Sequence, residues 1–145
     1  MEFEQLKLEN QLCFPVYAAS RLIIREYQPF LGKLGITYPQ YLVLMVLWEK
    51  DCISVNEIAR KVILNTNTIT PLLKRLEEMG IILRKRSVSD ERVVIVELTV
   101  KGKLMQAKAA DIPEEICSNL LSGTLNINDL NDLKNKLVSL ITLLK

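Results

Sequence analysis

The stretch from Ser54 to Leu98 constrains the fold of this chain more than any other. Ser54 and Glu57 have the spacing of a capping box, in which two side chains bond the free backbone amides at the start of a helix. We therefore expect a helix to begin at Val55. Its apolar residues recur at three- and four-residue intervals, which is typical of a helix with one buried face.

A second helix should follow closely. Asn65 or Thr66 can cap it, because both side chains accept hydrogen bonds from the amides of a first helical turn. Gly80 fits the left-handed position that ends a helix. Five apolar residues at helical spacing should form the buried stripe of this helix: Ile69, Leu72, Leu73, Leu76 and Met79. The pattern predicts a helix-turn-helix.

A two-stranded hairpin is expected next. Residues 81–86 and 92–98 are rich in β-branched side chains, and a polar tip separates them. Asp90 lies two residues before Arg92 and can hold its guanidinium by a bidentate pair. The whole stretch predicts a winged helix-turn-helix within a mainly α fold that contains a small β hairpin.

Polar and basic side chains on these elements suit double-stranded DNA. In the major groove, Asn can pair with adenine, Thr can contact a thymine methyl, and Lys or Arg can reach guanine or phosphate. Basic residues on a projecting hairpin can follow the backbone or enter the minor groove. Considered by itself, the second helix could equally be an ordinary surface helix. The basic residues of the hairpin that follows favour the DNA-binding interpretation. The candidate DNA contacts are Asn65, Thr66, Asn67, Thr68, Thr70, Lys74, Arg75, Arg84, Arg86, Asp90 and Arg92.

Positive charge is concentrated on this same unit. Between Arg60 and Arg92 there are eight basic and four acidic side chains, a net charge of +4. The rest of the chain carries −2 of the total of +2. Such a local excess of positive charge favours a nucleic-acid partner.

The composition argues against several other classes of protein. The chain has no histidine and three widely spaced cysteines, so we expect no histidine-dependent catalytic triad, no metal site and no disulfide framework. No glycine-rich phosphate loop is present, and no cofactor is expected. No apolar run reaches membrane-spanning length, and the first ten residues do not resemble a signal peptide. We therefore expect a cytoplasmic protein that is not an enzyme and has no membrane partner.

Long apolar segments flank the predicted reading unit. We expect a first helix from about Glu4 to Phe30, which Pro15 should kink or break near Cys13. The last helix should start after Asn126 or Asn128 and carries leucines at helical spacing. These flanking helices are expected to form a homodimer interface, because two reading helices one DNA turn apart can bind a palindromic operator.

Shorter signals complete the organisation of the chain. Thr37 and Gln40 form a second capping box, so a core helix is expected from Tyr38. Thr99 can cap a helix after the hairpin, and Pro113 should then break it. We predict one domain, 1–145, with the winged helix-turn-helix at about 37–99 and dimerisation helices at about 4–31 and 100–145.

The chain resembles the MarR family of regulators and, within it, the OhrR branch of repressors that sense organic hydroperoxides. The segments that carry this resemblance are LENQLCFPVYAASR, ITYPQYLVLMVLWE, LTVKGK and NTNTITPLLKRLEEMGIILRKRSVSDERVVIVELT. It runs from about Leu8 to about Cys117; NQLCF and TYPQYL are specific to this branch, whereas DER in the wing is shared by the whole family. It implies a repressor that releases its operator when an organic hydroperoxide, the inducer, oxidises it.

The resemblance implies a redox-sensing role for Cys13, which stands where the family has its peroxide-reactive cysteine. Tyr17 and Tyr27 match the two tyrosines that hydrogen-bond to that sulfur, while Tyr38 and Tyr41 stand in the segment that lines its neighbourhood. Hydroxyl donors stabilise a thiolate, the reactive form of cysteine.

Helix geometry limits which of these tyrosines can reach the sulfur. Tyr17 lies one turn from Cys13, but Tyr27 is fourteen residues away, about 21 Å along a straight helix. Tyr27 can therefore meet Cys13 only from the antiparallel helix of a partner, or through a break at Pro15.

The other two cysteines differ in what the resemblance implies for them. Cys117 follows Ile112-Pro113-Glu114, which looks like the motif before the resolving cysteine of the two-cysteine class. The implied chemistry is a sulfenic acid at Cys13 and then a disulfide to Cys117 of the partner subunit. The alternative is that Cys117 is a small buried apolar residue. Cys52 has no matching role and is interpreted as incidental.

The chain departs from the family pattern in the reading helix. The OhrR branch usually has LDSGTLTP where this chain has LNTNTITP, so Asn65 replaces an aspartate and Asn67 a glycine. The preferred operator should therefore differ.

Two other functions stay open. The first is a MarR-type repressor released by a small phenolic or aromatic ligand, which predicts that Cys13→Ser keeps full induction. The second is a thiol peroxidase that uses Cys13 and Cys117. Such an enzyme would need no basic wing.

Overall fold

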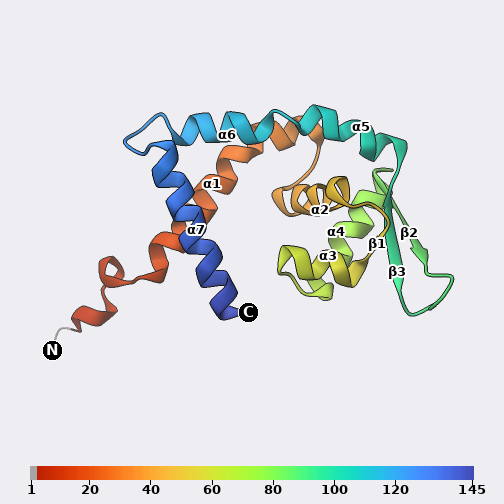
Figure 1. The fold of residues 1–145 in the computed structure, drawn as a ribbon, viewed down its shortest axis with the longest axis horizontal. Coiled ribbons are helices and arrows are strands. Elements are labelled where there is room, and N and C mark those ends of the chain that lie inside the picture. The colour runs from red at the N-terminus through yellow and green to blue at the C-terminus, as the bar shows by residue number, and fades with distance from the viewer. Residues whose placement is uncertain (1–2) are drawn as a thin grey trace. The chain divides into compact units, whose positions relative to one another are not determined.

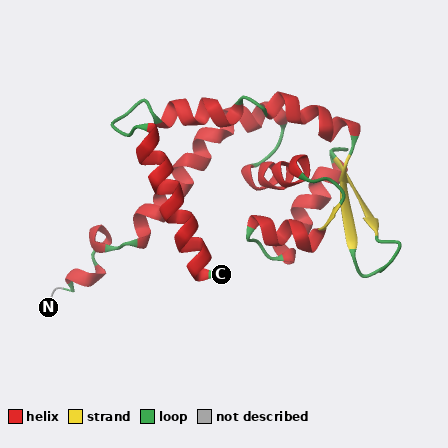
Figure 2. Cartoon of the chain, viewed as in Figure 1, coloured by secondary structure: helices red, strands yellow, loops and turns green. Residues whose placement is uncertain are grey.

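The computed structural model describes residues 3–145, which are mostly helical with one small sheet (Figures 1 and 2). Two short 3-10 turns, η1 (Glu4–Leu6) and η2 (Leu8–Asn10), precede the first α-helix. The remaining elements are α1 (Cys13–Leu34), α2 (Tyr38–Glu49), β1 (Ile53–Ser54), α3 (Val55–Val62), α4 (Thr66–Glu78), β2 (Ile82–Arg86), β3 (Val94–Leu98), α5 (Val100–Ala109), α6 (Ile112–Leu120) and α7 (Ile127–Leu144). The mainly α fold with a small hairpin is thus confirmed.

The chain forms two compact units, one ending at Ala110 and the other running from Asp111 to Lys145. The first unit contains α1 to α5 and the sheet. The second unit contains α6 and α7. Among the described residues, no single helix is long and apolar enough to cross a membrane; α1 and α2 meet that length and composition only as a pair bent by 72°.

The predicted winged helix-turn-helix is confirmed by α3, α4 and the hairpin of β2 and β3, which projects from the first unit (Figure 1). The Ser54 hydroxyl accepts a hydrogen bond from the Glu57 amide at 3.1 Å, and α3 begins at Val55 as expected. Of the two possible caps for α4, it is Asn65 that accepts from the Thr68 amide, at 2.9 Å.

The wing is part of a three-stranded antiparallel sheet with the order β1-β3-β2. Arg84 pairs with Val96 and Arg86 with Val94. The strands are shorter than predicted, because β3 begins at Val94 and not at Arg92. The Val93 amide donates to the Asp90 carbonyl at 2.9 Å, so the turn extends up to that point.

The core of the first unit joins α2, α3, α4 and the sheet. Ile58, Ile69 and Ile82 are fully buried, and each comes from a different element. The other large side chains with almost no exposed surface are Val43, Leu44, Leu47, Leu73, Leu76, Ile81 and Val96. The helix α4, predicted to read DNA, is anchored in this core by three of its side chains.

The prediction that the first helix starts near Glu4 is wrong, because α1 starts at Cys13. The residues before it form η1 and η2, which are separated by an extended Lys7. Asn10 Nδ2 donates to the Glu4 carbonyl at 2.8 Å, and Gln11 Nε2 donates to the Gln5 carbonyl at 2.8 Å. These side chains satisfy carbonyls that a continuous helix would have used itself.

Of the two effects expected of Pro15, a kink or a break near Cys13, the structure shows the break, because α1 begins at Cys13. Pro15 is the third residue of α1, where its missing N–H would have had no helical partner. Its ring would instead clash with a helical carbonyl four residues earlier, which prevents α1 from extending toward Gln11. The helix then runs unbroken to Leu34, through Pro29.

The helix also extends beyond its predicted end at Phe30, because α1 continues through Gly32 to Leu34. The helix ends at Gly35, whose φ of 71° places it in the left-handed region. The capping box of Thr37 and Gln40 then starts α2, as predicted.

Gly102 fixes the approach of α5 to the sheet. A Cβ at this position would overlap the Ile81 carbonyl oxygen, so only glycine fits here without a shift of the backbone. Thr99 caps α5 by accepting from the Gly102 amide at 3.1 Å. Although glycine is a poor helix former, its lack of a side chain is required at this position by the packing of α5 on the sheet.

Candidate functional site

The first turn of α4 holds several of the predicted DNA contacts in internal hydrogen bonds. Asn65 Oδ1 accepts from both the amide and the hydroxyl of Thr68, at 2.9 and 3.0 Å. The Thr70 hydroxyl donates to the Thr66 carbonyl at 2.8 Å. Asn65 and Thr68 are thus engaged in capping the helix, which leaves the other polar side chains of its exposed face as the candidates for direct contact with DNA.

The position of the exposed face of α4 can be derived from the position of its buried face. Ile69, Leu73 and Leu76 point into the core, and with 3.6 residues per turn the opposite side of α4 is centred on Asn67 and Lys74. Thr70 and Arg75 flank this line, and all of these polar side chains are exposed. Within residues 3–145, Lys74 and Arg75 make no ion pair, so both charges are available to an external partner.

The wing tip presents a fixed arginine. Arg92 Nε donates to Asp90 Oδ1 at 3.1 Å and its Nη2 donates to Oδ2 at 3.3 Å, which confirms the predicted bidentate pair. The Arg92 side chain is nevertheless 90% exposed. Arg86 donates from Nη1 to the Glu91 carbonyl at 2.8 Å. The tip therefore holds two guanidinium groups in defined positions that still face solvent.

Arg84 has a different environment. Its guanidinium donates to both carboxylate oxygens of Glu77, at 3.2 and 3.4 Å, and its backbone amide donates to the same carboxylate at 3.0 Å. These hydrogen bonds lower the pKa of Glu77. Arg84 joins β2 to α4 and so sets the angle between wing and reading helix.

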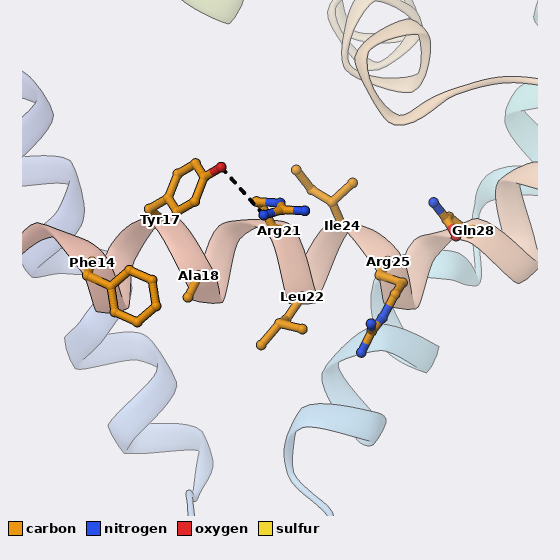
Figure 3. Close-up of a pocket in the computed structure, with 8 residues that line it drawn as sticks. All are labelled: Phe14, Tyr17, Ala18, Arg21, Leu22, Ile24, Arg25 and Gln28. Atoms are coloured by element: carbon orange, nitrogen blue, oxygen red, sulfur yellow. Dashed lines mark hydrogen bonds between the residues drawn. The ribbon is translucent and has the colours of Figure 1, made fainter. Parts of the chain in front are cut away.

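Cys13 is the first residue of α1 and is exposed. Tyr17 follows one turn later, and Arg21 another turn on; Figure 3 shows the side chains of Tyr17 and Arg21 reaching toward each other. Arg21 Nη1 donates to the Tyr17 hydroxyl at 3.5 Å, and its guanidinium lies 5.5 Å from the centre of the ring. The Tyr17 hydroxyl accepts this bond, so its own proton stays available to another acceptor.

Sequence reasoning missed Arg21. The signal was present, since positions 13, 17 and 21 recur at four-residue spacing and must share one face of a helix.

An open groove of about 490 Å³ runs along this part of α1, lined by Phe14, Tyr17, Arg21 and Leu22 among others (Figure 3).

Tyr27, Tyr38 and Tyr41 form a compact group, here called the tyrosine cluster. Ring centres of Tyr27 and Tyr38 are 4.9 Å apart, and those of Tyr27 and Tyr41 are 5.9 Å apart. Burial, followed by the neighbouring phenols Tyr38 and Tyr41, raises the pKa of Tyr27 to about 12. Burial also raises the pKa of Tyr38 and of Tyr41. These phenols therefore keep their protons at neutral pH and remain hydrogen-bond donors.

A single chain does not bring Cys13 and the tyrosine cluster together. Both Cys13 and Tyr27 belong to the uninterrupted α1, where fourteen residues correspond to about 21 Å. The route through a break at Pro15 is excluded, because α1 is continuous between Cys13 and Tyr27. Of the two ways in which Tyr27 could meet Cys13, only contact from the antiparallel helix of a partner is left.

The remaining cysteines have distinct settings. Cys117 lies in α6, in the second unit. Cys52 is exposed, has a φ of 57°, and lies with its Sγ 3.9 Å from Glu97 Oε2. Partial desolvation and then the negative charges of Asp51 and Glu97 raise the pKa of the Cys52 thiol. A raised pKa reduces the thiolate fraction, so Cys52 is poorly suited to react with a peroxide.

Among residues 3–145, no group of three or more His, Cys, Asp or Glu side chains could hold a metal ion.

The chain matches a known family model and a known regulator. The family model described as "Transcriptional regulator SarA/Rot" matches residues 25–108, which include the whole winged helix-turn-helix. The organic hydroperoxide resistance transcriptional regulator of Bacillus subtilis is 47% identical over 141 residues, covering 97% of this chain and 93% of that protein. This second match includes the segment around Cys13, which the family model does not reach.

Two solved structures of AbfR, a protein of Staphylococcus epidermidis, are also similar. Reduced AbfR bound to DNA is 39% identical with a TM-score of 0.81, covering 99% of this chain and 96% of that one. Disulfide-formed AbfR is 40% identical with a TM-score of 0.62, covering 97% and 92%. The likeness thus extends beyond the winged helix to both ends of the chain.

Proposed function

Because the chain belongs to the MarR family of transcriptional regulators, in its OhrR-like branch, we propose that it is a redox-sensing repressor that leaves its operator when an organic hydroperoxide oxidises Cys13. The strongest support is the identity of 47% to the regulator of organic hydroperoxide resistance, which covers Cys13. The solved structures of AbfR include a DNA-bound and a disulfide form, and this likeness supports both parts of the proposal.

In the proposed complex, α4 enters the major groove of double-stranded DNA. Asn67 and Thr70 read base edges, while Lys74 and Arg75 pair with phosphate or guanine. At the wing, Arg86 and Arg92 contact the backbone or the minor groove, with Asp90 holding Arg92 in place. The other predicted contacts act indirectly. Asn65, Thr66 and Thr68 form the capped start of α4, and Arg84 fixes the wing through Glu77.

The proposed chemistry begins at the Cys13 sulfur. Its thiolate attacks one oxygen of the hydroperoxide, a sulfur–oxygen bond forms and the oxygen–oxygen bond breaks. The sulfur is oxidised to a sulfenic acid, and the other peroxide oxygen leaves as an alkoxide, which takes up a proton to become an alcohol. Cys117 of the partner subunit then attacks that sulfur, a disulfide forms, and the sulfenic oxygen leaves as water.

Phenol donors stabilise the reacting thiolate in this proposal. Tyr17 lies one turn from Cys13 in the same helix, and its proton is free because Arg21 supplies the bond that its oxygen accepts. Tyr27 and Tyr38 are proposed to come from the partner, since α1 is unbroken and too long for Tyr27 to fold back. The protein is therefore proposed to act as a homodimer on a palindromic operator.

The proposed domain organisation keeps the predicted boundaries. The winged helix-turn-helix occupies about 37–99, and the flanking segments of about 4–31 and 100–145 form the dimer. Within the first segment the α-helical part starts at Cys13, so residues before it contribute only through η1 and η2. A cytoplasmic location remains a prediction.

The test is a gel-shift measurement with the DNA upstream of the protein's own gene. Reduced protein is expected to bind, and one equivalent of an organic hydroperoxide should release it. The same samples on a non-reducing denaturing gel should show a dimer band that dithiothreitol reverses and that Cys117→Ser lacks.

Each other outcome has a defined meaning. Release without the dimer band would leave Cys13 as a one-cysteine sensor, with Cys117 structural. Full release in Cys13→Ser would contradict the redox proposal and favour a repressor released by a bound ligand. Catalytic turnover of peroxide with a thiol reductant, unaffected by Arg92→Ala, would point to a peroxidase.

A further inference from the structure

Trp48 connects two elements that are far apart in the sequence. It lies in α2, and its indole Nε1 donates to the carbonyl of Gly102 in the first turn of α5 at 3.0 Å. On its other side its ring centre is 6.2 Å from that of Tyr41, in an edge-to-face arrangement. One side chain therefore contacts both the tyrosine cluster and α5.

Gly102 is in turn tied to the base of the wing. It lies so close to the Ile81 carbonyl that no side chain fits between them. The Thr99 amide donates to that same carbonyl at 3.1 Å, and the Thr99 hydroxyl donates to it at 3.0 Å. Because β2 begins at the next residue, Ile82, a displacement of Gly102 must move the start of the wing as well.

A continuous set of contacts thus runs from α1 to the wing. Tyr27 of α1 packs against Tyr41, Tyr41 packs against Trp48, and Trp48 bonds the first turn of α5. All of these residues belong to the first unit of the chain. Packed aromatic rings and a hydrogen bond transmit small displacements because close-packed interiors yield little.

We propose that Trp48 is a positioning residue that couples the tyrosine cluster to the wing through its hydrogen bond to Gly102. This inference rests on the proposed function, since it assigns the route by which oxidation at Cys13 alters DNA binding. When the tyrosines rearrange around the oxidised sulfur, Trp48 shifts the first turn of α5 and with it β2. The wing then leaves the position in which it contacts DNA together with α4.

The test compares peroxide responses, defined as the DNA dissociation constant after oxidation divided by that before. Trp48→Phe keeps an aromatic ring beside Tyr41 but removes the indole N–H. The reduced variant should bind DNA nearly as tightly as the wild type, because no residue of α4 or of the wing tip is changed. Its peroxide response should fall by about five-fold or more, the lower end of typical coupling between sites.

Lys101→Met is the matched control. It also removes a hydrogen bond between α5 and a backbone carbonyl, since Lys101 Nζ donates to the Met79 carbonyl at 2.7 Å. This bond lies outside the set of contacts that leads from Tyr27 to Gly102, so the variant should keep the wild-type peroxide response. An equal loss in Lys101→Met and Trp48→Phe, or an unchanged response in Trp48→Phe, overturns the proposal.

A second measurement needs no variant at Trp48. The chain contains one tryptophan, so emission excited at a wavelength that tryptophan absorbs and tyrosine does not reports on Trp48 alone. Its emission should change on oxidation with the same time course as DNA release. Release with no change in emission overturns the coupling role but leaves the redox sensor intact. If the wild type does not release DNA at all, the proposed function fails and this coupling fails with it.

Discussion

At the scale of single residues, Tyr27 has the most strongly perturbed acid–base chemistry. Its pKa is raised from 10.0 to about 12, so the folded protein keeps this proton where the unfolded chain has lost it. The contribution to stability is therefore complete below about pH 10 and is lost as the pH rises to about 12. Tyr27→Phe has no phenol to titrate, so denaturant unfolding at increasing alkaline pH should show a shallower loss of stability than in the wild type. If stability fell equally steeply with pH in the two proteins, the raised pKa of Tyr27 would be refuted.

Cys52 is the residue that combines an unusual backbone with an unfavourable thiol. Its φ of 57° is one that asparagine tolerates better than other side chains, and its thiol pKa is raised by desolvation and by the nearby carboxylates. Cys52→Asn should therefore unfold at the same or a slightly higher denaturant concentration. Its DNA release by organic hydroperoxide should match the wild type in gel-shift titrations. A lost response would mean that Cys52 takes part in sensing after all.

At the scale of whole elements, the packing of α5 on the sheet depends on one missing side chain. Gly102→Ala would push a Cβ into the Ile81 carbonyl oxygen, and overpacking of this kind costs about 1–3 kcal/mol. Gly32→Ala is the natural comparison, because Gly32 lies in α1 and a Cβ added there would meet no atom within 4 Å. That change should instead stabilise by about 0.5–1 kcal/mol, the helix preference of alanine over glycine. Denaturant unfolding of both variants measures the difference, and equal effects would contradict it.

The elements that sequence reasoning located well are those with a local chemical signal at their ends. Thr37, Ser54, Asn65 and Thr99 each cap the helix that was predicted to follow them, and Gly80 takes the left-handed conformation. Such signals act within a few residues and need no tertiary information. They were sufficient to predict the winged helix-turn-helix.

The start of α1 shows where this reasoning fails. Apolar residues continue on both sides of Cys13, so periodicity alone extended the helix to Glu4. The helix does not extend before Cys13, because the side chains of Asn10 and Gln11 take backbone carbonyls that helical hydrogen bonds would have used. Pro15 reinforces this start. Which partner a side-chain amide selects depends on geometry that periodicity does not contain.

The candidate site shows a second limit. The bidentate bond of Asp90 to Arg92 was predictable because the two residues are neighbours, whereas the bond of Glu77 to Arg84 requires the register of β2 against α4. The contact of Trp48 with Gly102 spans 54 positions and has no sequence signal. Long-range contacts of this kind decide which basic residues are free and which are structural.

At the scale of the whole molecule, the proposed sensor is complete only in a pair of chains. Cys13 belongs to the first unit and Cys117 to the second, and the proposed disulfide joins the first unit of one chain to the second unit of another. Mixed dimers of two variants distinguish this arrangement from a disulfide within one chain. Cys13→Ser keeps only Cys117 of the pair, and Cys117→Ser keeps only Cys13.

Neither variant alone should form a covalent dimer after one equivalent of an organic hydroperoxide, because each lacks one of the two sulfurs. Subunits exchanged between them should give mixed dimers with one complete pair, and a non-reducing gel should then show a dimer band that dithiothreitol removes. Two tags of different length identify that band as the mixed species. If the disulfide formed within a chain, the mixture would give no such band and the oxidised wild type would migrate as a monomer. Each variant still contains Cys52, so a band in either variant alone would mean that Cys52, or a disulfide between two like cysteines, replaces the proposed pair.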